Sequence, residues 1–316
     1  MYREPIFLKP VCQDRIWGGT KLREEYGYEI PSETTGECWG ISAHPNGPSI
    51  VESGQFAGKS LNELWKKQPD LFANPPEAEF PLLTKILDAN MDLSVQVHPD
   101  DLYAKVHENG ELGKTECWYI IDCDEDADII FGHSAQTKQE LETMIEEEKW
   151  SKLLQRVKIK PGDFFYVPSG TIHAICKGTL VLETQQSSDT TYRVYDYDRT
   201  DMDGNKRELH LQKAIDVTTV PQTEQRTHDK VERVTSAEIT TFTEAEYFSV
   251  YKWDVNGTFE YNNEKSYLLC SVLNGAASIL TEDGEFPLKK GTHFIIPATL
   301  KRFKIKGEAT LIVSHT

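Results

Sequence analysis

Two stretches of the chain, residues 157–175 (VKIKPGDFFYVPSGTIHAI) and 286–305 (FPLKKGTHFIIPATLKRFKI), share one plan. In each, a basic strand end leads into a glycine turn, then an aromatic and aliphatic strand, then a proline. Two copies of one strand–turn–strand element imply two related units, each closing its own core. Most of the remaining chain consists of short apolar runs broken by Gly, Pro, Asn and Asp, which is typical of all-β barrels and sandwiches. The sequence therefore predicts a mainly β protein built from two related barrels.

Helices are expected only at the periphery. Ser60–Glu63 is a capping box that precedes LNELWKKQPDLF, and Thr137–Glu140 is a second one. The second precedes apolar residues that fall roughly on one helical face: Leu141, Met144, Ile145, Leu153 and Leu154. A shorter helix is expected near ELHLQKAIDV.

A polar segment between the two copies suggests where the domains meet. Residues 220–240 are poor in apolar side chains. We therefore expect an N-terminal domain over residues 1–230, carrying the helical insertions, and a C-terminal barrel over residues 231–316.

The charge and the cysteine content indicate which partners and which cellular compartment to expect. The 316-residue chain has a formal net charge of −17, which opposes binding to nucleic acid because that affinity comes from neutralising phosphates. A few local Lys and Arg residues can still bind a small phosphorylated molecule. No apolar run is long enough to cross a bilayer, and the N-terminus lacks the pattern of a secretory signal. Six scattered cysteines without a C-x-x-C pair indicate reduced thiols in a cytoplasmic protein.

A polar pair on one predicted strand points to a metal site. In residues 92–99 (DLSVQVHP), apolar and polar side chains alternate, so Gln96 and His98 would face the same barrel lumen. Glu116 begins another apolar strand, where a carboxylate is costly unless it is paired or binds a cation. These residues predict a buried ligand set inside the first barrel.

The third candidate ligand, His173, lies in the most specific motif. Gly162, Pro168, Gly170 and His173 fit G-x5-P-x-G-x2-H, which resembles the second conserved motif of cupins. That resemblance implies two cupin-type jelly-roll barrels in which Gly and Pro shape a hairpin that delivers the histidine to a metal. The second copy has residues 298–301 at the corresponding place and no histidine there, so the metal is expected in the first barrel only.

The predicted ligand set suits more than one metal. Two imidazoles and one carboxylate fit a catalytic Zn²⁺, which keeps a position open for water or substrate, and they also fit Fe²⁺ as a facial triad. Gln96 stands where cupins usually have a first histidine, and an amide oxygen is a weaker ligand than imidazole. We expect one divalent ion per chain, and the donor set alone does not choose between Zn²⁺, Fe²⁺ and another divalent ion.

Seven segments, in this order, resemble the type I mannose-6-phosphate isomerases of the short bacterial kind, a family in the cupin superfamily. They are RIWGG (15–19), TGECWGISAH (35–44), FPLLTKILDA (80–89), LSVQVHP (93–99), GELGKTECWYII (110–121), PGDFFYVPSGTIHAI (161–175) and TYRVYDYDR (191–199). The resemblance implies a zinc-dependent enzyme that interconverts mannose 6-phosphate and fructose 6-phosphate. It implies His98, Glu116 and His173 as zinc ligands and Gln96 as a fourth. Longer relatives carry an additional helical domain that this chain is too short to contain, so their phosphate contacts cannot be carried over.

The resemblance also assigns roles around the metal. It implies Arg193 as the catalytic arginine, Lys114 and Lys85 as active-site lysines, and Trp17 as a residue near the pocket. Strand alternation would place Thr191, Arg193 and Tyr195 on one face. An always-charged arginine can stabilise an enediolate, whereas a lysine whose pKa is depressed by burial beside a cation can transfer protons. Lys114, two residues before Glu116, is therefore the acid/base candidate.

Acidic residues near the arginine are assigned no chemistry. Asp196, Asp198 and Asp201 are expected to pair with Arg199 and Arg207 or to face solvent.

Two other functions compete with isomerisation. An Fe²⁺ cupin dioxygenase would use the same triad, and a non-catalytic sugar-binding cupin would bind metal without turnover.

Overall fold

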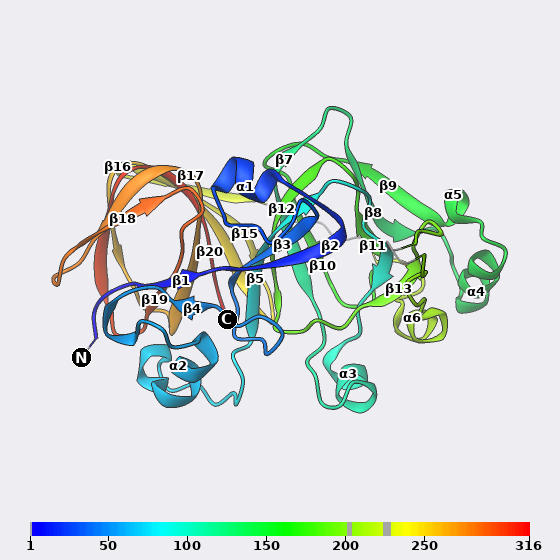
Figure 1. Cartoon of the computed structure of the whole chain (residues 1–316), viewed down its shortest axis with the longest axis horizontal. Coiled ribbons are helices and arrows are strands. Elements are labelled where there is room, and N and C mark those ends of the chain that lie inside the picture. Colours follow the sequence, from blue (N-terminus) through cyan, green and yellow to red (C-terminus); the bar gives the residue numbers. More distant parts are fainter. Residues whose placement is uncertain (1, 201–203, 224–228) are drawn as a thin grey trace.

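The computed structural model shows a mainly β protein, as predicted, with two β units side by side (Figure 1). It describes residues 2–200, 204–223 and 229–316. The first unit contains two sheets, and the strand pairing leaves them open rather than closing one continuous barrel. One has six strands in the order β10 (Phe164–Val167), β7 (Glu116–Cys123), β12 (Thr179–Gln186), β5 (Leu82–Ala89), β3 (Thr35–Ile41) and β2 (Val11–Gly19). The other has five, in the order β13 (Tyr192–Tyr195), β6 (Val95–Val97), β11 (His173–Ile175), β8 (Asp128–His133) and β9 (Leu154–Lys158).

The second unit is a nine-stranded sheet that includes strands from both ends of the chain. Its order is β14 (Lys230–Val234), β15 (Ala237–Glu244), β16 (Ser249–Asn262), β20 (Arg302–His315), β17 (Tyr267–Leu280), β19 (His293–Pro297), β1 (Ile6–Lys9) and β4 (Ile50–Val51), with β18 (Glu285–Lys289) paired to β17. Because β1 pairs with β19, an N-terminal segment contributes to the C-terminal sheet. The division at residues 230 and 231 stays a prediction.

The two similar sequence segments fold alike. The first covers the end of β9, then β10 and β11, and the second covers β18, β19 and the start of β20. Their glycine turns adopt the left-handed backbone conformation, with φ of +93° at Gly162 and +85° at Gly291. The expected repetition of one β element is therefore confirmed.

Short helices decorate the sheets, as expected. They are α1 (Lys21–Tyr26), α2 (Leu61–Lys67), α3 (Asp101–His107), α4 (Lys138–Glu146), α5 (Trp150–Leu153) and α6 (Leu211–Val217), with 3₁₀ turns η1 (Gly54–Phe56) and η2 (Pro69–Phe72). The capping box at Ser60 and the helix near ELHLQKAIDV are confirmed. Among the described residues, none of the helices is long and apolar enough to span a membrane.

Two details of the helix prediction were wrong. Thr137 caps α4 by accepting from the Glu140 backbone N–H, but the Glu140 carboxylate accepts from Gln136 rather than closing a reciprocal box. The expected helical face also does not continue through Leu154, because the chain turns after α4, where Glu148 has φ +52°, and Leu154 starts β9. Helix α3, inside the loop between His98 and Glu116, has an Asp100 N-cap that the sequence analysis overlooked.

Packing places the functional region between the two sheets of the first unit. Helices α4 and α6 bury Leu141, Ile145 and Ala214 against one face of the five-stranded sheet, together with Val95 and Val97 of β6. The intervening residue, Gln96, therefore points to the opposite face, toward the six-stranded sheet. Apolar residues seal the outside and leave polar ones directed inward.

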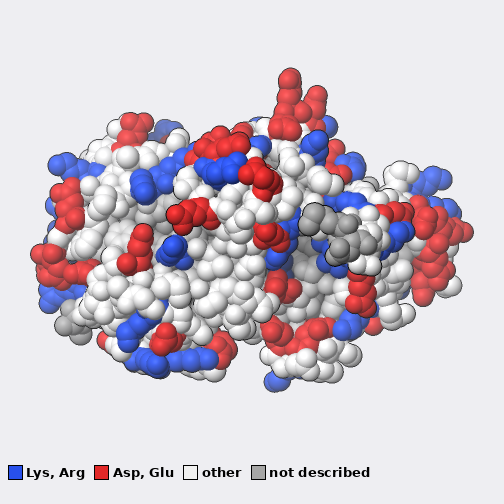
Figure 2. All heavy atoms as spheres, viewed as in Figure 1, with Lys and Arg blue, Asp and Glu red and all other residues white. Residues whose placement is uncertain are grey.

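Acidic and basic side chains are interspersed over the face seen in Figure 2, and an acidic group lies at the right-hand end, where Figure 1 shows α4 and α5. On this face, the acidic side chains that contribute to the net charge of −17 do not form one continuous patch. Local basic positions remain available for an anionic ligand.

Replacing Gly170 by alanine should destabilise the fold more than replacing Gly162. Both glycines have positive φ, +82° and +93°, so each alanine meets the backbone cost of about 1–2 kcal/mol. A Cβ on Gly170 would also lie 2.5 Å from Thr219 Oγ1, whereas one on Gly162 meets nothing within 4 Å. We expect Gly170→Ala to lower the free energy of unfolding by about 1–3 kcal/mol more than Gly162→Ala, measured by chemical denaturation. Equal losses in the two variants would contradict this packing.

Candidate metal centre

Three buried side chains from three strand ends converge between the sheets. Glu116 is the first residue of β7, His173 is the first residue of β11, and His98 directly follows β6. Each is at most 1% exposed, and their ligand atoms lie within 4.8 Å of one another. Within residues 2–200, 204–223 and 229–316, this is the one group of three or more His, Cys, Asp or Glu side chains arranged to hold a metal ion. The three ligands predicted from sequence are thus brought together.

Backbone carbonyls orient both histidines toward the same point. Nδ1 of His98 lies 2.9 Å from the carbonyl oxygen of Thr190, and Nδ1 of His173 lies 2.9 Å from that of Thr171. Since a carbonyl only accepts, each Nδ1 must carry the proton, and each Nε2 keeps its lone pair. These Nε2 atoms lie 3.3 Å from opposite oxygens of Glu116. Burial, together with the charge of Lys114, lowers the pKa of His98 to about 3, so its imidazole is neutral and suited to ligation.

The Glu116 carboxylate is buried without an aligned hydrogen bond to either oxygen. Burial alone would raise its pKa, but the charge of Lys114 and the two imidazoles hold the pKa well below the usual range. Lys114 Nζ lies 2.7 Å from Glu116 Oε2 and 3.0 Å from His98 Nε2. A buried carboxylate whose two oxygens accept no aligned hydrogen bond, beside two imidazole lone pairs, fits a divalent cation.

Strand register places Gln96 and Arg193 beside this centre. On adjacent strands, Arg193 of β13 is the partner of Gln96 of β6, which is also the partner of His173 of β11. Gln96 Nε2 lies 3.3 Å from His173 Nε2, so ligation by Gln96 would require the amide to turn and present its oxygen. The role of Gln96 as a ligand therefore stays a prediction.

A cavity of about 420 Å³ opens beside the metal centre. All four residues predicted around the metal line it: Trp17, Lys85, Lys114 and Arg193. Gln96 and Lys114 also form part of its wall, and these contact His173 and His98. Trp17 is only 4% exposed, so its ring serves as packed wall. The structure thus places every predicted site residue in one connected region.

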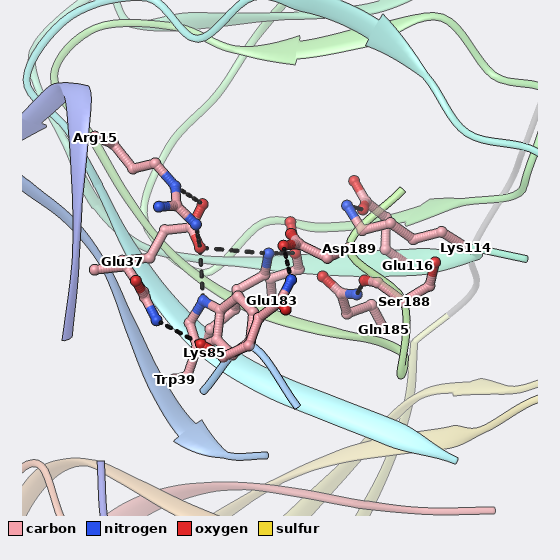
Figure 3. A network of polar contacts seen from close by, with 12 residues as sticks. Arg15, Glu37, Trp39, Lys85, Lys114, Glu116, Glu183, Gln185, Ser188 and Asp189 are labelled. Atoms are coloured by element: carbon pink, nitrogen blue, oxygen red, sulfur yellow. Dashed lines mark hydrogen bonds and ion pairs between the residues drawn. The ribbon is translucent and has the colours of Figure 1, made fainter. Parts of the chain in front are cut away.

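A row of alternating charges crosses the six-stranded sheet along the cavity (Figure 3). Arg15 of β2 binds Glu37 of β3 through two contacts of 3.1 Å. Lys85 of β5 lies 3.8 Å from Glu37 and 3.1 Å from Glu183 of β12. Burial would raise the pKa of Glu37, but Lys85 and Arg15 hold it at about 2. The buried charges on this wall therefore stand in neutralising pairs.

Several cavity residues were missed by the sequence analysis. They are Arg15, Glu37, Glu183, Asp189 and Arg207. Glu37 and Glu183 carry the same signal that drew attention to Glu116, a carboxylate within an apolar strand. Arg207 follows no such pattern, because it lies outside the strands and reaches the cavity through a loop.

The prediction that Thr191, Arg193 and Tyr195 share one face was wrong for Tyr195. A bulge between Arg193 and Tyr195 pairs Tyr195 with Val95, whose side chain faces away from the cavity. Tyr195 instead stacks on Trp150, with ring centroids 4.6 Å apart. Thr191 and Arg193 remain in the cavity wall.

The nearby acidic residues pair as expected. Asp196 binds Arg199 and Arg207, and Asp198 is 78% exposed and binds Lys206. Asp201 lies outside the described residues.

Comparison with known proteins identifies the family. Residues 6–120 match the family described as phosphomannose isomerase type I, catalytic domain, and residues 238–316 match mannose-6-phosphate isomerase, cupin domain. Two relatives from Bacillus subtilis (strain 168), the putative mannose-6-phosphate isomerase YvyI and mannose-6-phosphate isomerase ManA, are 58% and 56% identical, and both alignments span 100% of each chain. A crystal structure of mannose 6-phosphate isomerase from Bacillus subtilis superposes with a TM-score of 0.98 at 58% identity, covering 99% of this chain and 100% of that one. The chain therefore belongs to the type I phosphomannose isomerase family.

Replacing Glu116 by glutamine should abolish tight metal binding. The substitution removes the only carboxylate of the ligand set, so we expect divalent-metal affinity to fall by more than about 100-fold, beyond the loss of an outer-shell partner. Titration calorimetry with Zn²⁺ on metal-free protein measures this. Glu208→Gln, at a side chain 83% exposed, is the matched control and should bind like the wild type. Wild-type affinity in Glu116→Gln would exclude this ligand set.

Proposed function

We propose that this member of the type I phosphomannose isomerase family interconverts mannose 6-phosphate and fructose 6-phosphate through a cis-enediol. The observation that carries the proposal is the convergence of the His98, Glu116 and His173 cluster with Lys114 and Arg193 at one cavity. The names of relatives at 56–58% identity, which are mannose-6-phosphate isomerases, support mannose 6-phosphate as one of the two sugars. A small phosphorylated sugar is therefore the proposed partner.

We propose Zn²⁺ as the ion, held by His98, Glu116 and His173, with Gln96 as a fourth ligand once its amide oxygen turns inward. Two imidazole nitrogens and one carboxylate fit a catalytic zinc with room for substrate. Such an ion supplies Lewis-acid polarisation of the sugar oxygens at C1 and C2.

Arg193 is proposed to stabilise the negative charge of the enediolate. Its Nε donates to Ser94 Oγ at 3.3 Å, and one terminal nitrogen donates to the Glu208 carbonyl at 2.8 Å. These contacts fix the guanidinium through neutral acceptors, and no salt bridge to a carboxylate is found for it among the described residues. Its charge is therefore available to an anion that develops in the cavity.

Lys114 is proposed as the group that moves the proton between C1 and C2. Its Nζ lies in the cavity wall, within 3.0 Å of one metal-ligating nitrogen, and the side chain is only 4% exposed. An amine at this position would adjoin the reacting carbons of a sugar bound beside the three ligands. Lys85, held between Glu37 and Glu183, is proposed to contact sugar hydroxyls rather than to transfer protons, and Trp17 to form an apolar wall.

A cytoplasmic location is proposed as well, supported by six cysteines that are all free. The comparisons do not favour an Fe²⁺ dioxygenase or a non-catalytic sugar-binding cupin.

Zinc-loaded protein should convert fructose 6-phosphate to mannose 6-phosphate. Removal of the metal with a chelator should abolish turnover, and added Zn²⁺ should restore it, because the ion proposed at this ligand cluster supplies the Lewis acid of the reaction. A coupled assay for mannose 6-phosphate measures the product, and an oxygen electrode tests the dioxygenase in the same sample. Folded, zinc-loaded protein that forms no product would overturn the proposed function.

Replacing Arg193 by alanine should lower kcat by about 100- to 1,000-fold, the usual cost of losing one group that stabilises an oxyanion. Zinc content should stay at the wild-type level, since Arg193 contacts none of the three ligands. Arg156→Ala, at a surface side chain 51% exposed, is the control and should retain activity. Near-wild-type turnover in Arg193→Ala, with zinc bound, would remove Arg193 from the mechanism.

A further inference from the structure

Arg207 reaches the cavity from the loop between β13 and α6 and is held there by one carboxylate. Its Nε donates to Asp196 Oδ2 at 2.8 Å, and its NH2 donates to Asp196 Oδ1 at 2.6 Å. This two-point contact fixes the plane of the guanidinium. The side chain is 24% exposed and lines the same cavity as Arg193. Arg207 is therefore a preorganised cation at the cavity wall.

Arg199 also binds Asp196 and helps to fix its position. Its Nη2 donates to the Asp196 carboxylate and its Nε to the Asp196 backbone carbonyl, while its Nη1 donates to the carbonyl oxygen of Asp92. All three guanidinium nitrogens of Arg199 are thus used, and its side chain does not line the cavity. Asp196, which is 5% exposed, is held by two arginines and in turn positions Arg207.

Among the described residues, which leave out 201–203 of this loop, the charges at this end of the cavity do not balance. Arg199 and Arg207 share one buried carboxylate, Asp196. The guanidinium of Arg193 donates only to neutral acceptors among the described residues, Ser94 and the Glu208 carbonyl. Burial and the charges of Arg207 and Arg199 lower the pKa of Arg193, and the charges of Asp196 and Glu208 only partly oppose this. Glu208, which also lies near Arg193, is 83% exposed, so solvent screens its contribution.

The opposite wall has no such surplus. There Arg15 and Lys85 face Glu37 and Glu183, and Asp189 adds a further carboxylate. A dianion entering the cavity would be repelled at that wall and attracted to the arginine end.

We propose that Arg207, positioned by Asp196, binds the phosphate group of the sugar. The inference rests on the proposed function for its substrate class, a sugar 6-phosphate. Planar guanidinium groups match phosphate oxygens in a two-point geometry that a lysine cannot reproduce. Arg193 is in register with Gln96 and His173 on neighbouring strands, so it adjoins the metal end, and Arg207 binds three residues farther along the chain at Asp196. This order matches a sugar with its reacting carbons at the metal and its phosphate at the other end.

Binding of glucitol 6-phosphate, a sugar alcohol phosphate that cannot be isomerised, tests the site independently of turnover. In titration calorimetry on zinc-loaded protein, the wild type should prefer glucitol 6-phosphate to glucitol. Arg207→Gln should weaken binding of glucitol 6-phosphate by about 10- to 100-fold, the range for losing charge-assisted hydrogen bonds. Its affinity for glucitol and its zinc content should not change.

Lys206→Gln is the matched control, because it removes the same charge from the neighbouring residue, whose side chain is 62% exposed and paired with Asp198. It should bind glucitol 6-phosphate within about twofold of the wild type, since exposed charges are screened. Arg207→Lys guards against a folding defect, because it keeps the charge; it should still weaken binding by about tenfold as the two-point contact is lost. Wild-type affinity in folded Arg207→Gln, or in Arg207→Lys where the glutamine variant does not fold, would overturn the inference.

The same samples separate this inference from the proposed function. Wild-type protein that binds glucitol 6-phosphate through Arg207 but does not isomerise fructose 6-phosphate would refute the isomerase and retain the phosphate site. Protein that isomerises fructose 6-phosphate with an unchanged KM in Arg207→Gln would refute the phosphate site and retain the isomerase.

Discussion

A buried carboxylate without an aligned hydrogen bond, that of Glu116, is the constraint on which the site depends. Taking such a charge out of water costs several kcal/mol unless cations compensate it. Here Lys114 Nζ lies 2.7 Å away, and two neutral imidazoles direct lone pairs at the same point. Because Glu116 comes from one sheet and both histidines adjoin strands of the other, the ligand set requires the two sheets to face each other. A divalent ion at this point would complete the compensation and tie the sheets together.

On the six-stranded sheet, the buried charges are likewise compensated by neighbours of opposite sign, here without a metal. Arg15, Glu37, Lys85 and Glu183 alternate in sign across four strands, and indole N–H groups of Trp39 and Trp118 donate to the two carboxylates at 2.6 and 3.0 Å. Buried ion pairs of this kind contribute little net stability, since desolvation offsets their attraction. Their consequence is positional: Lys85 is held rigidly at the cavity wall and presents a fixed donor to a ligand.

Strand alternation and short motifs were sufficient to predict part of this arrangement from the sequence. Alternation around His98 and the glycine and proline frame around His173 predict side chains that enter one lumen, and the structure brings them together with Glu116. The carboxylates of Glu37 and Glu183 carried the same signal as Glu116 but lacked a motif to single them out. The bulge that turns Tyr195 outward, the loop that brings Arg207 to the cavity, and the pairing of β1 with β19 depend on tertiary contacts between distant segments. Such contacts leave no periodic trace in the sequence.

The distribution of paired and surplus charge explains how an acidic chain can select an anionic sugar. A net charge of −17 repels dianions at long range, but salt screens that repulsion beyond about 8–10 Å. Inside the cavity, the attraction or repulsion of an anion depends on the charges within a few ångströms of it. Lys85 and Arg15 are neutralised by carboxylates within 4 Å, whereas Arg193 is fixed by a hydroxyl and a carbonyl, and Arg207 shares one carboxylate with Arg199. A neutral sugar leaves the mutual repulsion of these arginines in place, and a sugar phosphate relieves it. The phosphate can therefore fix the orientation of the substrate before any bond at C1 or C2 changes.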